Sequence, residues 1–247
     1  MEEVELERYK RHFILPNWSV DNQEKLKKLK CFVAGAGGTG SPTITLLTLM
    51  GVGKIVVCDF DVFEQSNKNR QFIHSMGDDR VGMNKAKSAC LTVKSINPYV
   101  ETEYFDEKFD ESNIDALVGD CDCIFDCVDS FKYKFILADC AMRKNIPDFF
   151  FGIMNYNTFG YIFYPPKTAC FHCMFDERKV ALTDKLTVKK SPVAVTAPTL
   201  FTATGLMVSQ ALKFIVEYDS PLFNKAFFTF SQQKDLLSDR GMRSFKF

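Results

Sequence analysis

The sequence lacks an excess of either charge, because 31 lysines and arginines are balanced by 31 aspartates and glutamates among 247 residues. A chain with no net charge offers no long-range attraction to nucleic acid or to anionic lipid. We therefore expect no nucleic-acid partner and no membrane partner. Any site for a polyanion must be local, which suits a nucleotide better than a polymer.

A secretory signal is also lacking, because the acidic start Met-Glu-Glu-Val-Glu-Leu-Glu contains no apolar core. The uncharged stretch at residues 191–212 is long enough to span a bilayer, but it contains two prolines, a glutamine and several hydroxyl residues. A buried loop followed by a core helix explains that mixture better. The nine cysteines, an odd number often set in apolar surroundings, indicate reduced, mostly buried thiols in a cytoplasmic protein.

Short apolar strands alternate with helical segments in the first part of the chain. We expect strands at residues 31–34, 54–59, 100–105 and 123–128, and helices at residues 2–30, 43–50, 84–96, 110–118 and 131–144. Such alternation predicts an α/β fold: a Rossmann-like, mostly parallel sheet with helices on both faces. The C-terminal half differs, with antiparallel strands expected at residues 149–164 and 225–230 and a core helix at residues 199–218.

A glycine-rich motif joins the first predicted strand to the helix that follows. Its glycines are Gly35, Gly37, Gly38 and Gly40. The spacing G-x-G-x-x-G lets the backbone turn tightly and come close to phosphates. Asp59 ends the next strand, where a carboxylate can hold a ribose hydroxyl. On this motif alone the chain could be an NAD(P)-binding oxidoreductase.

Charged residues after the motif favour a triphosphate over a dinucleotide. Arg70 and Lys85 are two cations that would offset the charge of a triphosphate and of a departing pyrophosphate. Asp129 lies just past a buried strand, at the edge where open α/β sheets bind ligands. A carboxylate beside a triphosphate is a natural Mg²⁺ ligand. Together these residues describe an ATP site.

The motifs resemble those of the ThiF/MoeB/HesA family, the bacterial relatives of ubiquitin-activating enzymes. The matching segments are Arg8-Tyr-Lys-Arg11-His, Gly35-Ala-Gly-Gly-Thr-Gly-Ser-Pro42, Asp59-Phe-Asp61, Ser66-Asn-Lys-Asn-Arg70-Gln71, Lys85, Asp126-Cys-Val-Asp129, Cys170-Phe-His-Cys173 and the helix at residues 199–218. They occur in the family's order and extend over nearly the whole chain.

The resemblance implies ATP-dependent adenylation of a C-terminal carboxylate, above all that of a small ubiquitin-like sulphur-carrier protein, with acyl-AMP and pyrophosphate as products. The implied nucleotide-binding residues are Gly35, Gly37, Gly38, Gly40, Asp59, Asp61, Asn67, Arg70, Gln71, Lys85 and Asp129, and the implied catalytic residues are Asp129, Arg70, Lys85 and Arg11. Asp129 would hold Mg²⁺. Arg11 would reach into the site of a partner subunit, which implies a homodimer.

No linker and no internal repeat divides the chain into separate domains. We expect one adenylyltransferase domain over residues 1–247. It comprises a helical segment at residues 1–30, a nucleotide-binding half at residues 31–147, and a C-terminal half at residues 148–247 that carries the substrate surface.

The cysteines depart from the family's pattern in two ways. Many members bind zinc with two C-x-x-C pairs, whereas here no cysteine follows Cys170 and Cys173. A structural zinc site needs four ligands, so we expect no zinc and interpret the pair as vestigial or simply buried, with a redox role as an alternative. Residues 176–197 also lack the cysteine with which other members form a thioester or persulfide. We therefore expect the reaction to stop at the acyl-adenylate.

Several alternatives stay open beside the carrier hypothesis. The carboxylate could belong to a peptide C-terminus or to a group on tRNA, although the zero net charge weighs against tRNA. The oxidoreductase hypothesis depends on the glycine motif alone. A non-catalytic scaffold would have no use for the combined charges of Arg70, Lys85 and Asp129.

Overall fold

One eight-stranded sheet forms the centre of the protein. The structure, a computed structural model, describes residues 1–77, 79–154, 156–176, 195–217, 226–231 and 242–246. The strands are β1 (Lys30–Ala34), β2 (Lys54–Cys58), β3 (Glu101–Phe105), β4 (Cys123–Asp126), β5 (Asp148–Met154), β6 (Asn157–Phe163), β7 (Ala226–Ser231) and β8 (Met242–Lys246). Their order in the sheet is β3-β2-β1-β4-β5-β6-β7-β8. Pairs from β3 to β5 are parallel and pairs from β5 to β8 are antiparallel.

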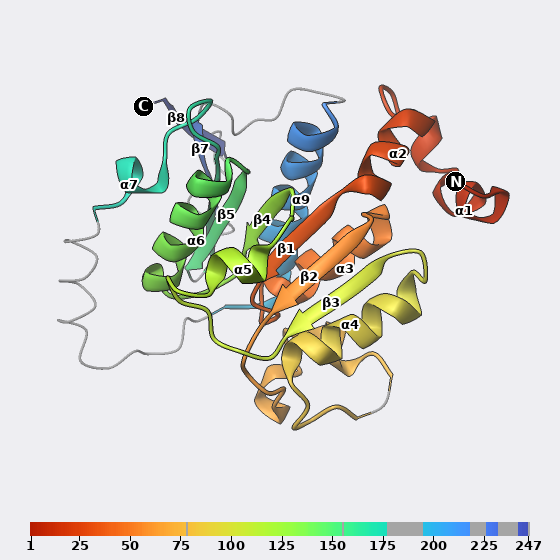
Figure 1. Cartoon of the computed structure of the whole chain (residues 1–247), viewed down its shortest axis with the longest axis horizontal. Coiled ribbons are helices and arrows are strands. Elements are labelled where there is room, and N and C mark those ends of the chain that lie inside the picture. Colours follow the sequence, from red (N-terminus) through yellow and green to blue (C-terminus); the bar gives the residue numbers. More distant parts are fainter. Residues whose placement is uncertain (78, 155, 177–194, 218–225, 232–241, 247) are drawn as a thin grey trace.

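Helices cover both faces of this sheet. They are α1 (Glu3–Tyr9), α2 (Val20–Lys28), α3 (Gly40–Met50), α4 (Lys85–Ile96), α5 (Ile114–Val118), α6 (Phe131–Lys144), α7 (Phe171–Met174) and α9 (Ala197–Val216), with short 3-10 turns η1 (His12–Ile14), η2 (Gln65–Asn67) and η3 (Phe72–Ser75). In Figure 1, α5 and α6 lie in front of the sheet and α9 lies behind it. The predicted α/β fold, with its mostly parallel sheet and antiparallel C-terminal strands, is confirmed.

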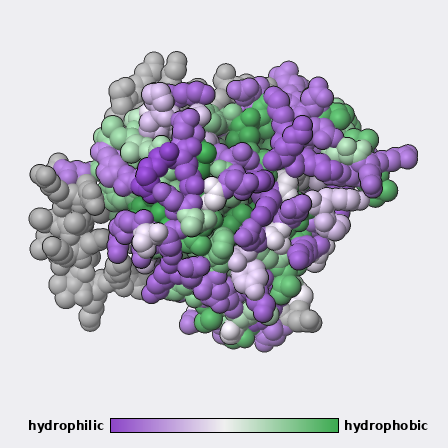
Figure 2. Space-filling model, in the orientation of Figure 1, coloured by the Kyte–Doolittle hydropathy of each residue, from purple (hydrophilic) through white to green (hydrophobic). Residues whose placement is uncertain are grey.

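Alternating side chains of the central strands pack against two helical layers. In β1, Cys31 and Val33 join a core with α3, α4 and α9, whereas Phe32 and Ala34 join a core with α5 and α6. Burial on both faces explains the uninterrupted apolar residues of β1 and β2. On the outside, the face in Figure 2 is mostly hydrophilic, and its hydrophobic residues form small patches.

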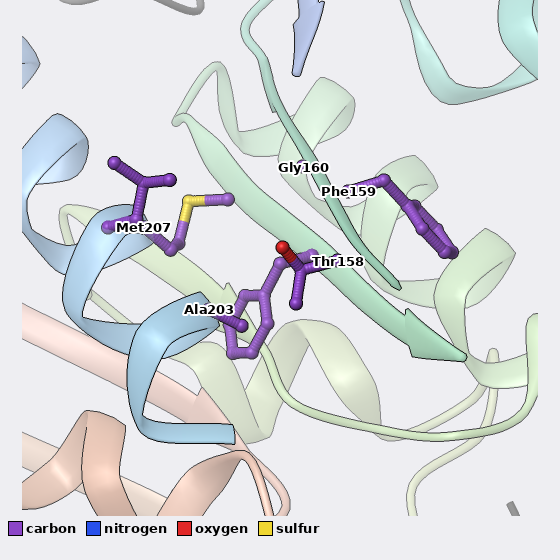
Figure 3. A pocket seen from close by; sticks show the side chains of 7 residues that line it. Thr158, Phe159, Gly160, Ala203 and Met207 are labelled. Carbon is purple, nitrogen blue, oxygen red and sulfur yellow. The ribbon is translucent and has the colours of Figure 1, made fainter. Parts of the chain in front are cut away.

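Helix α9 is the expected core helix. Within the described residues it is the one helix long and apolar enough to cross a membrane, and 56% of its most apolar window is buried. It packs on α3, β5 and β6. Figure 3 shows the small gap between α9 and these strands, which holds about 10 Å³ and is lined by Phe151, Thr158, Phe159, Gly160, Ala203, Leu206 and Met207. Such a gap has room for about one water, so it is a packing void and not a ligand site.

Two predicted helices are shorter than the sequence suggests. The segment at residues 2–30 breaks into α1, η1 and α2, so the prediction of one helix is wrong. Asn17 adopts a positive φ of 63° between them, and Ser19 caps the start of α2. Helix α5 likewise begins late, because the Asp110 carboxylate accepts the Ser112 amide and favours a local turn over a helix.

A buried tyrosine attaches the N-terminal segment to the rest of the protein. Tyr9 is 2% exposed, and its hydroxyl accepts a hydrogen bond of 2.9 Å from the Asn97 side chain. The same Asn97 amide donates to the Thr48 carbonyl oxygen at 2.9 Å. Gly51 makes room for this contact: its φ is 76°, and an added Cβ would overlap the Tyr9 hydroxyl. The end of α3, the end of α4 and α1 therefore meet at Tyr9.

We expect Gly51→Ala to destabilise the fold more than Gly82→Ala does. Both glycines have a positive φ, which costs an alanine about 1–2 kcal/mol. A Cβ at Gly82 would meet nothing within 4 Å, whereas one at Gly51 would displace Tyr9, at a further cost of about 1–3 kcal/mol. Urea unfolding of both variants measures the difference. Equal losses would show that Tyr9 is not held at Gly51.

Candidate functional site

The strand order places a topological switch point between β1 and β4. From β1 the chain continues to β2 and β3 on one side, and it then crosses to β4 and β5 on the other. Open α/β sheets bind their ligands at such a point, outside the carboxyl ends of the strands. The glycine motif follows β1 and Asp129 follows β4, so the fold brings both to this point.

The glycine motif forms a turn that is too tight for other residues at two positions. Gly35 has a φ of 93°, and its amide donates to the Cys58 carbonyl oxygen at 2.8 Å. A Cβ added to Gly40 would overlap the Gly35 carbonyl oxygen. Gly37 and Gly38 are less restricted, since the nearest atoms to an added Cβ lie 3.7 and 3.3 Å away. Glycine is therefore required at Gly35 and Gly40 to bring β1 directly into α3.

The start of α3 presents free backbone donors. Among the described residues, no acceptor pairs with the amides of Gly37, Gly38 and Thr39. All three residues are partly exposed, and α3 continues for 11 residues behind them. Unpaired amides and the helix dipole together favour an anion at this position.

The loop after β4 is joined to the same helix start. The Thr39 hydroxyl donates to the Cys127 carbonyl oxygen at 3.0 Å. Asp129, two residues further on, is exposed and has no hydrogen bond or ion pair with a described residue. A carboxylate with no partner in the described part of the chain thus lies in the loop that borders these amides.

Asp59 shapes the glycine loop from the end of β2. Its Oδ2 accepts the Ala36 amide at 2.7 Å, and its Oδ1 accepts the Asp61 amide at 2.8 Å. Burial raises the pKa of Asp59, and these two hydrogen bonds oppose that rise. Each oxygen keeps a further lone pair, so the predicted contact with a ribose stays open as a prediction.

His74 contacts the carbonyl group of Ala36, on the opposite side from the amide that Asp59 accepts. The sequence analysis did not predict this role. The Nε2 of His74 lies 2.8 Å from the Ala36 carbonyl oxygen, and its Nδ1 lies 3.0 Å from the Ser88 hydroxyl. Burial lowers the pKa of His74 to about 4, so the imidazole is neutral at neutral pH. In the sequence only its position three residues after Gln71 would have drawn attention to it.

The two predicted cations lie on the same edge of the sheet. Lys85 opens α4, and its Nζ lies 3.1 Å from a carboxylate oxygen of Asp61. Arg70 donates to the Ser66 carbonyl oxygen at 3.0 Å, and its Cδ lies 3.9 Å from a Cβ added at Gly38. The side chain of Arg70 therefore lies beside the glycine loop.

Gln71 and Asn67 differ in how they relate to the loop. Gln71 is buried, its Nε2 lies 3.7 Å from a Cβ added at Gly37, and its Oε1 has no partner in the described part of the chain. Asn67 instead closes the turn at η2, where its Oδ1 accepts the Glu64 amide at 3.1 Å. Gln71 therefore lies beside the glycine loop, and the phosphate contacts of Gln71 and Asn67 both stay predictions.

Arg11 is not brought to the site of its own chain. It is exposed and follows α1, which Tyr9 anchors near the start of β3. Figure 1 shows α1 at the end of the sheet where β1 begins, away from the carboxyl ends of the strands. A role for Arg11 would therefore require a second subunit.

The cysteine pair also lies apart from the glycine loop. The Sγ atoms of Cys170 and Cys173 are 2.9 Å apart beside α6, where His172 pairs with Asp139 at 2.7 Å. Cys173 is exposed and Cys170 half-buried, so the interpretation as a simply buried pair is wrong. No group of three or more potential ligands exists in the described residues, so the pair does not fit a zinc site.

A buried ion pair supports the loop that carries Asp129. Lys134 donates to Asp126 at 2.8 Å, and both side chains are at most 5% exposed. The charge of Lys134 is thus neutralised by Asp126 inside the protein and is not available to a ligand. Asp148 is fully buried, and neither of its carboxyl oxygens has a partner among the described residues. Burial, and then the charge of Asp126, raises the pKa of Asp148 well above its ordinary value.

Comparisons with known proteins agree with this architecture. A model of the ThiF family matches residues 9–246. The chain is 35% identical over 177 residues to the SAMP-activating enzyme E1 of Haloferax volcanii; the match covers 72% of this chain and 64% of that enzyme, less than two thirds of its length.

Two solved structures share the fold. PaaA has 27% identity and a TM-score of 0.83, and the match covers 100% of this chain and 84% of PaaA. MccB of E. coli, solved with AMPCPP and MccA, has 24% identity and a TM-score of 0.80, and the match covers 97% of this chain and 71% of MccB.

We expect Asp148→Asn to stabilise the protein increasingly as the pH rises. A carboxyl whose pKa is higher in the folded state contributes stability below its unfolded pKa, and this contribution is lost as the pH rises through the folded pKa. The amide cannot ionise, so it avoids this loss. Free energies of unfolding at pH 5 and pH 8 test the prediction, with the exposed Asp129→Asn as the control. A gain that does not grow with pH would contradict it.

Proposed function

The chain belongs to the ThiF family, and from that premise we propose that it catalyses the ATP-dependent adenylation of a C-terminal carboxylate. The products are acyl-AMP and pyrophosphate. The relative in Haloferax volcanii is a SAMP-activating enzyme E1. A small ubiquitin-like carrier protein is therefore the substrate class that we favour.

One observation carries the proposal. The amides at the start of α3 and the Asp129 carboxylate have no partners among the described residues, and they lie on neighbouring loops at the switch point of the sheet. The amides offer an anion-binding surface, and the carboxylate offers a cation-binding group. A triphosphate with its metal ion needs both. A nicotinamide dinucleotide would use the amides, but it would give Asp129 no metal ion to bind and Arg70 and Lys85 no γ-phosphate to neutralise.

In the proposed reaction, a carboxylate oxygen of the substrate attacks the α-phosphorus of ATP. The bond from that phosphorus to the bridging oxygen of pyrophosphate breaks, and pyrophosphate leaves with the electron pair. Arg70 and Lys85 would stabilise the charge on the phosphates, while the glycine loop and Asp59 would fix the nucleotide. Catalysis of this kind depends on positioning and on electrostatic stabilisation.

Asp129 fits the predicted Mg²⁺ ligand. Magnesium in nucleotide sites is held by one or two carboxylates together with phosphates and water, so a single exposed carboxylate suffices, and Asp129 has no partner among the described residues. A bound Mg²⁺ would neutralise phosphate charge. The two thiols of Cys170 and Cys173 take no part in this scheme.

The proposal includes a homodimer and a cytoplasmic site of action. Arg11 is exposed and follows α1, which Figure 1 shows at the end of the sheet where β1 begins, so we expect it to serve the site of a second subunit. The absence of a cysteine from residues 176–197 leaves any sulphur transfer to another protein. A peptide C-terminus stays the second substrate class, since the fold alone does not distinguish the two.

We expect Asp129→Asn to lower ATP–pyrophosphate exchange by about 10²-fold or more, because a charged group at the reacting phosphates is lost. Exchange is measured with Mg²⁺ and, in parallel, a carrier that ends in Gly-Gly, a peptide, and no acyl substrate. Glu111→Gln, an exposed carboxylate outside the site, is the control and should keep wild-type activity. Measurable ATP binding without exchange for any of these substrates would contradict carrier adenylation.

A further inference from the structure

His74 is a buried histidine whose two ring nitrogens are both engaged. It is 0% exposed in η3, and its pKa of about 4 keeps the ring neutral. A carbonyl oxygen can only accept, so Nε2 carries the proton and donates to Ala36. Nδ1 is then the acceptor and receives the Ser88 hydroxyl. The tautomer of His74 is thus fixed by its two neighbours.

These contacts determine how the glycine loop presents its amides. In a trans peptide the C=O and the following N–H point in opposite directions. Because the Ala36 carbonyl faces the buried His74, the amide of Gly37 must face the other way, toward the open side of the loop. Asp59 holds the preceding peptide through the Ala36 amide. Both peptide groups that flank Ala36 are therefore fixed by side chains.

We infer that His74 is a positioning residue for ATP, which orients the Gly37 amide toward the phosphates by holding the Ala36 carbonyl. The inference rests on the proposed function and adds a residue to it. Gly37 has no side chain to restrain its backbone, so the donor needs an anchor from outside the loop. A donor fixed in advance binds an anion without the cost of ordering it.

The histidine also connects the loop to the helix that carries Lys85. Ser88 lies one turn after Lys85 on α4, and it is fully buried against His74. The imidazole ring is therefore one of two links between the glycine loop and the start of α4, the other being Asp59, which binds both Ala36 and Asn84. A rigid ring with a donor and an acceptor at its two ends suits this bridge.

Two substitutions separate the two hydrogen bonds of His74. The Nε2 of glutamine can take the place of the imidazole Nε2, so His74→Gln keeps a donor to Ala36 and loses the acceptor for Ser88. The Oδ1 of asparagine can take the place of Nδ1, so His74→Asn keeps the acceptor and cannot reach Ala36. Each variant loses one buried hydrogen bond, which makes their folding losses comparable.

The experiment is calorimetric titration of the full chain with ATP and Mg²⁺, followed by exchange kinetics. We expect His74→Asn to weaken ATP binding by about tenfold or more and to raise KM for ATP, with KM for the acyl substrate unchanged. His74→Gln should bind ATP within about threefold of wild type. Urea unfolding of both variants, with circular dichroism, serves as the control for folding.

Equal ATP affinity of folded His74→Asn and wild type would overturn the positioning role and leave the proposed function intact. Equal weakening by both variants would also overturn it, because a general packing role predicts no rescue by glutamine. Failure of the wild type itself to bind ATP would instead overturn the proposed function, and this inference with it.

Discussion

The close approach of the Gly35 carbonyl to Gly40 is the constraint on which the site depends. Because the backbone folds back on itself there, the short turn at residues 35–39 is enough to lead β1 into α3. The start of α3 consequently lies at the carboxyl end of β1, beside the loop after β4. Four other groups of the proposed site are placed relative to this turn. Asp59 and His74 bind Ala36. Arg70 lies beside Gly38 and Gln71 beside Gly37.

Ionisable groups in the interior are neutral or paired, whereas charged groups of the proposed site reach solvent. Lys134 and Asp126 neutralise each other, His74 stays neutral, and the raised pKa of Asp148 favours its protonated form. Uncompensated charge is thus kept out of the core, where it would be costly. The charges expected to act on a ligand, those of Arg70 and Asp129, reach solvent. This division explains how a chain with no net charge can still offer a charged site.

The fold was accessible from sequence because its signals are local. Strands buried on both faces are continuous apolar runs, and glycine spacing marks the turn after β1, so the doubly wound half and the carboxyl-edge location of the site could be predicted. The break before α2 depends on the cap at Ser19, a local signal that the pattern of charges obscured. The sequence analysis did not predict β8, which among the described strands pairs with β7 at the end of the sheet.

The features that the sequence analysis did not predict depend on contacts between residues far apart in the sequence. His74 reaches Ala36 across 38 positions. The charge of Asp126 acts on Asp148 because β5 pairs with β4, in a register that places Asp148 opposite Ile124. A histidine or an aspartate inside a mostly apolar segment gives no local sign of such a partner. From its sequence position Asp148 resembles the polar first residue of a strand, although it is completely buried in the structure.

Helix α4 connects two places that the sequence treats as separate. Its 12 residues form a rod about 18 Å long. Lys85 is the first residue of this helix. Just past the other end, the Asn97 side chain donates a hydrogen bond to Tyr9, the last residue of α1. Helix α4 therefore links the N-terminal segment, which carries Arg11, to the lysine that the proposed function places at the phosphates.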